Sequence, residues 1–142
     1  MKIAAQHNQR ILIVDDDEDI RRALIDSLML RGYHCAAADH GESALRYLDT
    51  DRFHLVITDY RMPIMDGIQL LEALKKHPTH DRTPVILLTA DMSIELRRQA
   101  LELGAYAVID KLIAFQDLAV LSARAIEGRV VDQSGLSERR DD

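Results

Sequence analysis

The sequence predicts an α/β protein, a doubly wound three-layer sandwich in which one sheet of five parallel strands lies between two layers of helices. Three observations lead to this fold. Short apolar runs alternate along the chain with longer segments of helical period. The apolar runs are nearly continuous, as in strands that are covered on both faces. The length of 142 residues fits one domain, and right-handed crossovers fold five strand–helix units into this sandwich.

Each of the five units has its own signal. The predicted strands are the apolar runs 11–14, 33–38, 55–58, 85–89 and 107–109. Stripes of apolar residues at helical spacing predict helices that include 20–28, 70–74 and 118–125. Asp39 followed by Glu42 is typical of a capping box, which predicts a further helix over 41–49. Gly32 and Gly104 lie where helices are expected to end.

The charge balance limits the partners of the protein. With 24 acidic and 18 basic residues the formal net charge is −6, so we expect no broad basic surface and no direct binding of nucleic acid. Residues 1–10 are polar, and every apolar run is too short to span a membrane, so a soluble cytoplasmic protein is expected. The expected organisation is an N-terminal extension over 1–9, one domain over 10–128 and a polar tail or linker over 129–142.

The residues that follow the predicted strands carry the chemistry. In a doubly wound sheet, ligands bind beyond the carboxyl ends of the strands. The residues at these ends are Asp15 and Asp16 after the first strand, Asp59 after the third, Thr89 at the end of the fourth and Lys111 after the fifth. Carboxylates at two strand ends suit Mg²⁺, and a carboxylate such as Asp59 can act as a nucleophile toward a phosphoryl group.

Acidic residues after a strand also have a simpler explanation. Asp and Glu are favoured in the first turn of a helix, where they interact with the helix dipole. We assign Asp17, Glu18 and Asp19 to this role. For Asp15 and Asp16 taken alone, helix capping is the commoner explanation, and it is the coincidence with the other strand ends that favours a site.

Four segments resemble a known family, the receiver domains of bacterial two-component response regulators. ILIVDDD at 11–17 is similar to the family's first strand and acid pair, and DYRMPIMDG at 59–67 is similar to its phosphoacceptor loop. LTA at 88–90 and the stretch 104–111 resemble the segments that carry a switch threonine and a lysine. The resemblance covers about residues 10–128 and implies a flavodoxin-like fold.

The resemblance implies a phosphorylation switch with Asp59 as the phosphoacceptor. The phosphoryl group would come from a sensor histidine kinase or a phosphotransfer protein. The Thr89 hydroxyl and the Lys111 ammonium would neutralise charge on the phosphoryl oxygens. Such a domain catalyses only its own phosphorylation and dephosphorylation, so it is not counted as an enzyme.

The resemblance also implies Mg²⁺ as the cofactor. Its protein ligands would be Asp15, Asp16, Asp59 and the backbone carbonyl of Arg61, with Asp16 favoured over Asp15 as a direct ligand. Without the metal, the crowding of three carboxylates is expected to raise their pKa values. Metal binding and phosphorylation are therefore expected to be linked.

Two positions depart from the family pattern. Val108 stands three residues before Lys111, where the family has an aromatic switch residue, and Tyr106 is two residues away from that place. Leu112 follows the lysine in place of a proline whose peptide bond is cis in the family. Because a cis bond before a non-proline residue costs about 2.5–4 kcal/mol, the Lys111–Leu112 bond is predicted to be trans.

The output of the protein stays open. It is either a single-domain regulator that contacts a downstream effector protein, or the N-terminal part of a longer regulator whose output domain follows residue 142; a weak homodimer is compatible with both. A third alternative is a degenerate receiver that acts as an interaction module without phosphorylation, which Val108 and Leu112 keep open. A hydrolase with an aspartyl-phosphate intermediate is disfavoured, since Arg61 stands where its second catalytic aspartate is expected.

Three loop features have structural interpretations. His77 and His80 lie in a polar, proline-containing loop, which we expect to be solvated rather than to bind a metal. Gly67 is expected to supply backbone freedom at the start of a helix. Arg61 and Asp91, on loops after the third and fourth strands, are expected to form an exposed ion pair that partly covers the crevice.

Overall fold

Strands and helices alternate in the computed structural model, which describes residues 9–112, 114–128, 130–131 and 137–138. The alternation follows the apolar runs and helical stripes of the sequence, because each apolar strand needs a helix to cover it. The strands are β1 (Arg10–Val14), β2 (His34–Ala38), β3 (Leu55–Asp59), β4 (Val85–Thr89) and β5 (Ala107–Asp110). The helices are α1 (Glu18–Met29), α2 (Gly41–Thr50), α3 (Gly67–Lys75), α4 (Ile94–Glu102) and α5 (Ala114–Glu127). In the segment expected to be a polar tail, β6 (Val130–Val131) pairs antiparallel with β7 (Ser137–Glu138).

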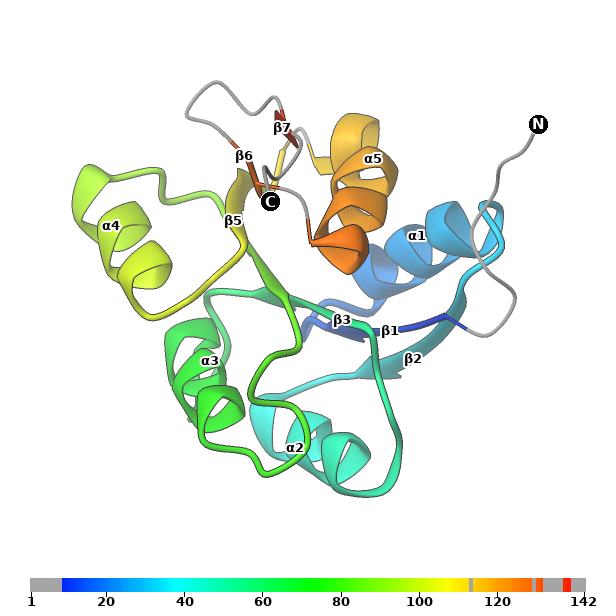
Figure 1. Ribbon diagram of the computed structural model, residues 1–142, viewed down its shortest axis with the longest axis horizontal. Coiled ribbons are helices and arrows are strands. Elements are labelled where there is room, and N and C mark those ends of the chain that lie inside the picture. The colour runs from blue at the N-terminus through cyan, green and yellow to red at the C-terminus, as the bar shows by residue number, and fades with distance from the viewer. Residues whose placement is uncertain (1–8, 113, 129, 132–136, 139–142) are drawn as a thin grey trace.

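The first five strands form one parallel sheet in the order β2-β1-β3-β4-β5. α1 and α5 cover one face of the sheet, and α2, α3 and α4 cover the other (Figure 1). This arrangement is the predicted doubly wound sandwich of the flavodoxin-like type. The strand order reverses at β1 and β3, so a ligand crevice is expected beyond their carboxyl ends. None of the described helices is long and apolar enough to cross a membrane.

The central strands are buried on both faces because their side chains alternate between two apolar layers. In β1, Leu12 and Val14 pack in the layer of α2, α3 and α4, whereas Ile11 and Ile13 pack in the layer of α1 and α5. β2 lies at the edge of the sheet, and its residues 35–37 are only half-buried. The double-sided core holds β1 and β3 side by side, which determines where their terminal carboxylates lie.

Local polar side chains begin the helices, with one correction to the sequence analysis. Asp17 caps α1 as expected, because its side chain accepts hydrogen bonds from two backbone N–H groups of the first turn. The expected capping box of Asp39 and Glu42 is wrong. The N-cap of α2 is His40, whose Nδ1 accepts the backbone N–H of Ser43 at 3.1 Å. A neutral imidazole nitrogen serves here as the acceptor that a carboxylate was expected to supply.

Glycines serve two different purposes in this fold. Gly32 and Gly104, near the ends of α1 and α4, have φ of 95° and 105°, as expected of residues that end helices. Gly67 lacks a positive φ, so the expectation that it supplies backbone freedom is wrong. A Cβ atom at Gly67 would lie 2.5 Å from the carbonyl oxygen of Asp59 and 2.6 Å from Cδ1 of Leu87. Glycine is required because the start of α3 packs directly on the end of β3.

The loop between α3 and β4 is largely exposed, as expected, but its two histidine side chains are turned inward. His80 is 2% exposed, and its Nε2 accepts the backbone N–H of Phe53 at 3.1 Å. The His77 side chain is 10% exposed, and its Nε2 lies 2.9 Å from Oδ1 of Asp49. The two rings can be buried because their nitrogens find partners, which offsets the cost of burying them.

Candidate functional site

Three carboxylates meet where β1 and β3 end. Val14 pairs with Thr58 in the parallel ladder, so the residues that follow them, Asp15 and Asp59, lie side by side. Asp15 is 1% exposed and Asp59 is 4% exposed, whereas Asp16 is exposed. Carboxylate oxygens of the three residues lie within 4.8 Å of one another. The structure therefore brings together the three acidic residues that were expected from the strand ends.

Lys111 reaches the same carboxylates from the edge strand β5. Its Nζ lies 3.1 Å from Oδ2 of Asp15 and 3.0 Å from Oδ2 of Asp59. Its backbone N–H donates to the carbonyl oxygen of Thr89, which holds the end of β5 beside the end of β4. The ammonium thus lies between two buried carboxylates and offsets part of their charge.

Burial and mutual repulsion shift the protonation of the cluster. Burial raises the pKa of Asp15, and the charge of Asp59 raises it further against the opposing hydrogen bond from Asp17. Burial also raises the pKa of Asp59, although Lys111 opposes this shift. For Lys111, burial would lower the pKa, but its bonds to Asp59 and Asp15 outweigh burial and raise the pKa. The positive charge of Lys111 is therefore stabilised, whereas the negative charges of Asp15 and Asp59 are disfavoured.

The donor set fits a hard divalent cation. Oδ1 of Asp15 accepts the N–H of Asp17 at 2.9 Å. Oδ2 of Asp15 is buried and has no aligned hydrogen bond, although the Lys111 ammonium is within ion-pair distance. A buried anionic oxygen of this kind is stabilised by a cation. Because Asp16 is exposed, water can complete a coordination shell of carboxylates, which is the environment that Mg²⁺ prefers.

Arg21 orients the acidic loop, and the sequence analysis missed it. Its Nη1 donates to the carbonyl oxygen of Asp15 at 2.7 Å. Arg21 lies on the same face of α1 as Leu24 and Leu28, which are buried. A charged residue on an apolar helix face was the available signal, since such a residue needs a polar partner. The contact ties α1 to the end of β1 and so helps to fix Asp15.

Thr89 ends β4, one residue beyond Leu88, which pairs with Asp59. Thr89 is 2% exposed, and its Oγ1 accepts the N–H of Asp91 at 2.9 Å. Because the oxygen accepts from Asp91, the hydroxyl hydrogen can be donated elsewhere. Arg61 Nη2 lies 3.9 Å from Oδ2 of Asp91, with side chains 78% and 36% exposed, so the expected pair across the crevice is present.

The segment around Lys111 departs from the family pattern, yet hydrogen bonds fix its backbone. Val108 is 4% exposed, and Arg97 of α4 donates from Nη1 to its carbonyl oxygen at 3.3 Å. The Lys111–Leu112 peptide bond is trans, as predicted. The N–H of Leu112 donates to Oδ1 of Asp110 at 2.9 Å, while the Leu112 side chain points into solvent, 83% exposed. The lysine thus reaches the carboxylates on a loop that has no proline.

Ile64, in the loop between β3 and α3, was also missed. Its φ is 73°, and the N–H of Met65 donates to the carbonyl oxygen of Pro63 at 2.7 Å, which makes a γ-turn centred on Ile64. The Ile64 side chain is fully exposed. A β-branched residue rarely adopts this conformation, so no sequence signal could have indicated it. The turn folds the chain back sharply between Asp59 and the start of α3.

Comparisons with known proteins agree with this geometry. Residues 11–122 match the family model described as the response regulator receiver domain. The chain is 38% identical over 118 residues to the regulatory protein AtoC of Escherichia coli strain K12, covering 83% of this chain and 25% of that protein. It is 35% identical over 129 residues to the response regulator MprA of Mycolicibacterium vanbaalenii, covering 91% of this chain and 54% of that protein. The chain therefore spans about a quarter to a half of the length of these curated relatives.

Solved structures give the same result. The chemotaxis response regulator CheY4 of Vibrio cholerae superimposes with a TM-score of 0.78 at 28% identity, covering 83% of this chain and 98% of that chain. The signal receiver domain of the response regulator NarL from Mycobacterium tuberculosis superimposes with a TM-score of 0.80 at 26% identity, covering 87% of this chain and 100% of that chain.

Proposed function

The chain belongs to the response regulator receiver family, and from this premise we propose that it accepts a phosphoryl group on Asp59 in the presence of Mg²⁺. The donor is a phosphohistidine of a sensor histidine kinase or a phosphotransfer protein. One observation carries the proposal: Lys111 contacts both Asp59 and Asp15 at the strand ends where Asp16 also converges. A buried carboxylate with a cation beside it is suited to phosphoryl transfer, which depends on positioning and neutralisation of charge.

The residues of the chain divide the transfer among them. A carboxylate oxygen of Asp59 attacks phosphorus, the O–P bond forms, the N–P bond to the donor imidazole breaks, and that imidazole takes up a proton. The Lys111 ammonium and the Thr89 hydroxyl donate to phosphoryl oxygens. When bound by Asp15, Asp16, Asp59 and the backbone carbonyl of Arg61, Mg²⁺ supplies further positive charge against those oxygens. Because Asp59 is modified and no metabolite is turned over, the protein acts as a switch.

The switch would act through contacts with other proteins. We place its domain over residues 10–128, with 1–9 as an N-terminal extension and 129–142 as a tail or linker. Output passes to a separate effector protein or to an output domain of a longer regulator, and a weak homodimer fits either arrangement. The net charge of −6 argues against direct binding of nucleic acid, and a cytoplasmic location suits a partner kinase.

A degenerate receiver without phosphorylation is the second candidate. The observation that favours it is the buried Val108, which stands where the family has an aromatic switch residue. In that case the chain would bind its partner equally well with and without a phosphodonor.

Intact mass separates the two candidates. Incubated with Mg²⁺ and acetyl phosphate, the wild-type protein is expected to gain one phosphoryl group, and Asp59→Asn is expected to gain none. Asp26→Asn, an exposed carboxylate on α1, serves as the matched control and should be modified like the wild type. Modification of Asp59→Asn would remove Asp59 from its role. If neither acetyl phosphate nor a phosphorylated histidine partner modified the wild-type protein, the second candidate, an interaction module without phosphorylation, would be favoured.

A further inference from the structure

Three histidines at the amino ends of the strands accept hydrogen bonds from the backbone. The bonds run from the N–H of Arg10 to Nδ1 of His54 at 3.0 Å, from the N–H of Phe53 to Nε2 of His80 at 3.1 Å, and from the N–H of Thr79 to Nδ1 of His77 at 3.2 Å. A backbone N–H can only donate, so each of these ring nitrogens must be unprotonated. All three bonds are lost if the accepting nitrogen takes up a proton.

Two of these rings belong to one directed chain of hydrogen bonds. Because Nε2 of His80 accepts from Phe53, its hydrogen is on Nδ1, which lies 3.2 Å from Oγ1 of Thr79. Nδ1 of His77 accepts the N–H of Thr79 at 3.2 Å, and the Thr79 hydroxyl, whose Oγ1 is 3.3 Å away, shares that acceptor. His77 then carries its hydrogen on Nε2 and donates to Oδ1 of Asp49 at 2.9 Å. The chain leads from a buried backbone amide to a carboxylate of α2.

The surroundings of His80 disfavour a positive charge. His80 is 2% exposed, and its ring packs against Phe53 and His77 at centroid distances of 6.2 and 5.1 Å. Burial, then the neighbouring His77 and Arg52, lower the pKa of His80, and Asp49 opposes them. Protonation would therefore place an uncompensated charge against the N–H of Phe53.

His54, which follows Phe53, is less buried than His80. Burial, then the charge of Arg52, lower its pKa; the hydrogen bond from the N–H of Arg10 opposes them, and the charge of Arg10 adds to them. Arg10 also lies 5.4 Å above the Phe53 ring and pairs with Asp51 at 3.3 Å. Among the described residues, the charges that act on His54 are therefore those of Arg52 and Arg10, and Arg10 is paired with Asp51.

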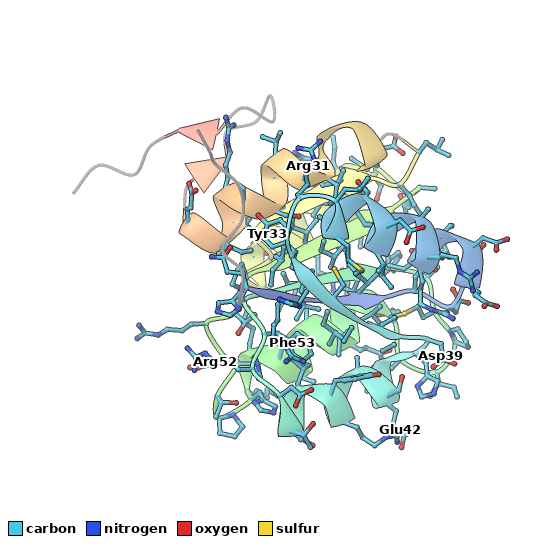
Figure 2. The ribbon with its side chains drawn as sticks, turned by 90° about the vertical axis from the view of Figure 1, so that its right-hand side faces the viewer. Arg31, Tyr33, Asp39, Glu42, Arg52 and Phe53 are labelled. Atoms are coloured by element: carbon cyan, nitrogen blue, oxygen red, sulfur yellow. The ribbon has the colours of Figure 1, made fainter. Side chains whose placement is uncertain are left out.

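The histidine bonds hold together segments that are far apart in the sequence. His54 and Phe53 lead into β3, whose other end carries Asp59, and His77 and His80 lie between α3 and β4. Figure 2 shows Arg52 and Phe53 toward one end of the sheet and Asp39, which follows β2, at the other. The bonds therefore clamp the loop before β3 to the start of β1 and to the loop before β4, at the edge opposite the carboxylates.

We propose that His54, His77 and His80 form a proton-responsive latch, a second input to this protein that is separate from the phosphoacceptor site. In the neutral form the latch clamps the loops at the amino edge of the sheet. Proton uptake on His80 and His54 replaces two hydrogen bonds by repulsion and releases the loops that precede β3 and β4. Because both pKa values are lowered on folding, the stabilisation is complete above the ordinary value of about 6.5 and is lost as the pH falls below it.

The wild-type protein provides a test that needs no substitution. Ring ¹⁵N spectra at about pH 7.5 are expected to show His80 with its proton on Nδ1 and His77 with its proton on Nε2. As the pH falls to about 5.5, the amides of Phe53 and Arg10 are expected to exchange with solvent before the amides of the central strands, after correction for intrinsic rates. A proton on Nε2 of His80 at neutral pH would overturn the latch.

Two isosteric substitutions test the energetic role. A glutamine oxygen lies about where Nε2 lies and an asparagine oxygen about where Nδ1 lies, and neither titrates, so His80→Gln and His54→Asn keep the acceptors without the proton switch. The matched control is His34→Gln, an exposed residue of the edge strand β2. The carboxylates at the other edge contribute equally to the pH dependence of every variant, so their contribution cancels when the variants are compared.

The measurement is the equilibrium constant for unfolding in urea at about pH 7.5 and about pH 5.5. As the pH falls over this range, linkage predicts that the unfolding equilibrium constant of the wild type increases by up to about tenfold for each histidine. The increase should be unchanged in His34→Gln and largely absent in the double variant His54→Asn, His80→Gln. Equal pH dependence in wild type and double variant would refute the proposal, whether or not Asp59 accepts phosphate.

Discussion

Asp15 and Asp16 are neighbours in the sequence with different surroundings. Asp15 is buried, with one oxygen held by the N–H of Asp17 and the other facing Lys111. Asp16 is exposed and lies within reach of the other two carboxylates. Asp15 is therefore part of the fixed framework of the site, whereas Asp16 is free to follow a cation.

Removal of Asp16 tests the metal site without disturbing the core. Mg²⁺ is expected to raise the melting temperature of the wild type, since a ligand at a hundred times its Kd stabilises by about 2.7 kcal/mol. Asp16→Ala is expected to lose most of this shift. Asp19→Ala, an exposed acid in the first turn of α1, should keep it. Equal shifts in wild type and Asp16→Ala, measured by thermal unfolding with and without Mg²⁺, would disprove the coordination.

The start of α3 supports the loop that carries Asp59. Asp66 caps the helix, and a reciprocal hydrogen bond joins it to Gln69. Gly67 then packs against the carbonyl of Asp59 with no room for a Cβ atom. Any side chain at Gly67 must push α3 away from β3, and this would move the loop that presents the phosphoacceptor.

A pair of glycine substitutions tests this packing. Gly67→Ala is expected to cost about 1–3 kcal/mol in urea unfolding, because its Cβ would meet a backbone oxygen that cannot move aside. Gly41→Ala, at the start of α2, should cost less, since its Cβ would meet the flexible side chain of Met65. The proposal that α3 packing sets the site also predicts slower phosphorylation of Gly67→Ala than of Gly41→Ala. An equal cost for the two variants would contradict the packing argument.

The molecule carries titratable clusters at both edges of its sheet, and they respond to pH in opposite directions. At the carboxyl edge, folding raises the pKa values of Asp15 and Asp59, so the metal-free folded state binds protons more tightly than the unfolded chain. These carboxylates therefore destabilise the metal-free protein at neutral pH, and the penalty is relieved as the pH falls through the raised values toward the ordinary 3.8. At the amino edge, the histidines lose stability as the pH falls.

Substitution of the phosphoacceptor should consequently stabilise the metal-free protein. In the presence of a chelator at neutral pH, Asp59→Asn is expected to unfold at a higher urea concentration than the wild type, because it removes a buried charge that burial penalises. The advantage should shrink as the pH approaches 4. Asp26→Asn, on the surface of α1, should show neither effect. A less stable Asp59→Asn at neutral pH would mean that its ion pair with Lys111 outweighs desolvation.

Sequence patterning by itself determined the order of the elements and the residues that stand at the strand ends. Strands covered on both faces appear as continuous apolar runs, and helices covered on one face appear as stripes, so burial is written into local periodicity. Once the strands were assigned, the rule for parallel sheets placed Asp15, Asp16, Asp59, Thr89 and Lys111 at one edge. The trans bond before Leu112 followed from covalent chemistry alone.

Only the tertiary structure decided which distant groups touch. Phe53 and His80 are 27 positions apart, and nothing local to either indicated that a ring nitrogen would accept that amide. The same holds for Arg21 on the Asp15 carbonyl and for the absence of space at Gly67. His40 caps α2 in place of the expected Asp39, because the path of the chain into the helix determines which of the two neighbouring acceptors lies at the N-cap. Such contacts depend on strand order and helix packing, which bring segments together that no local pattern relates.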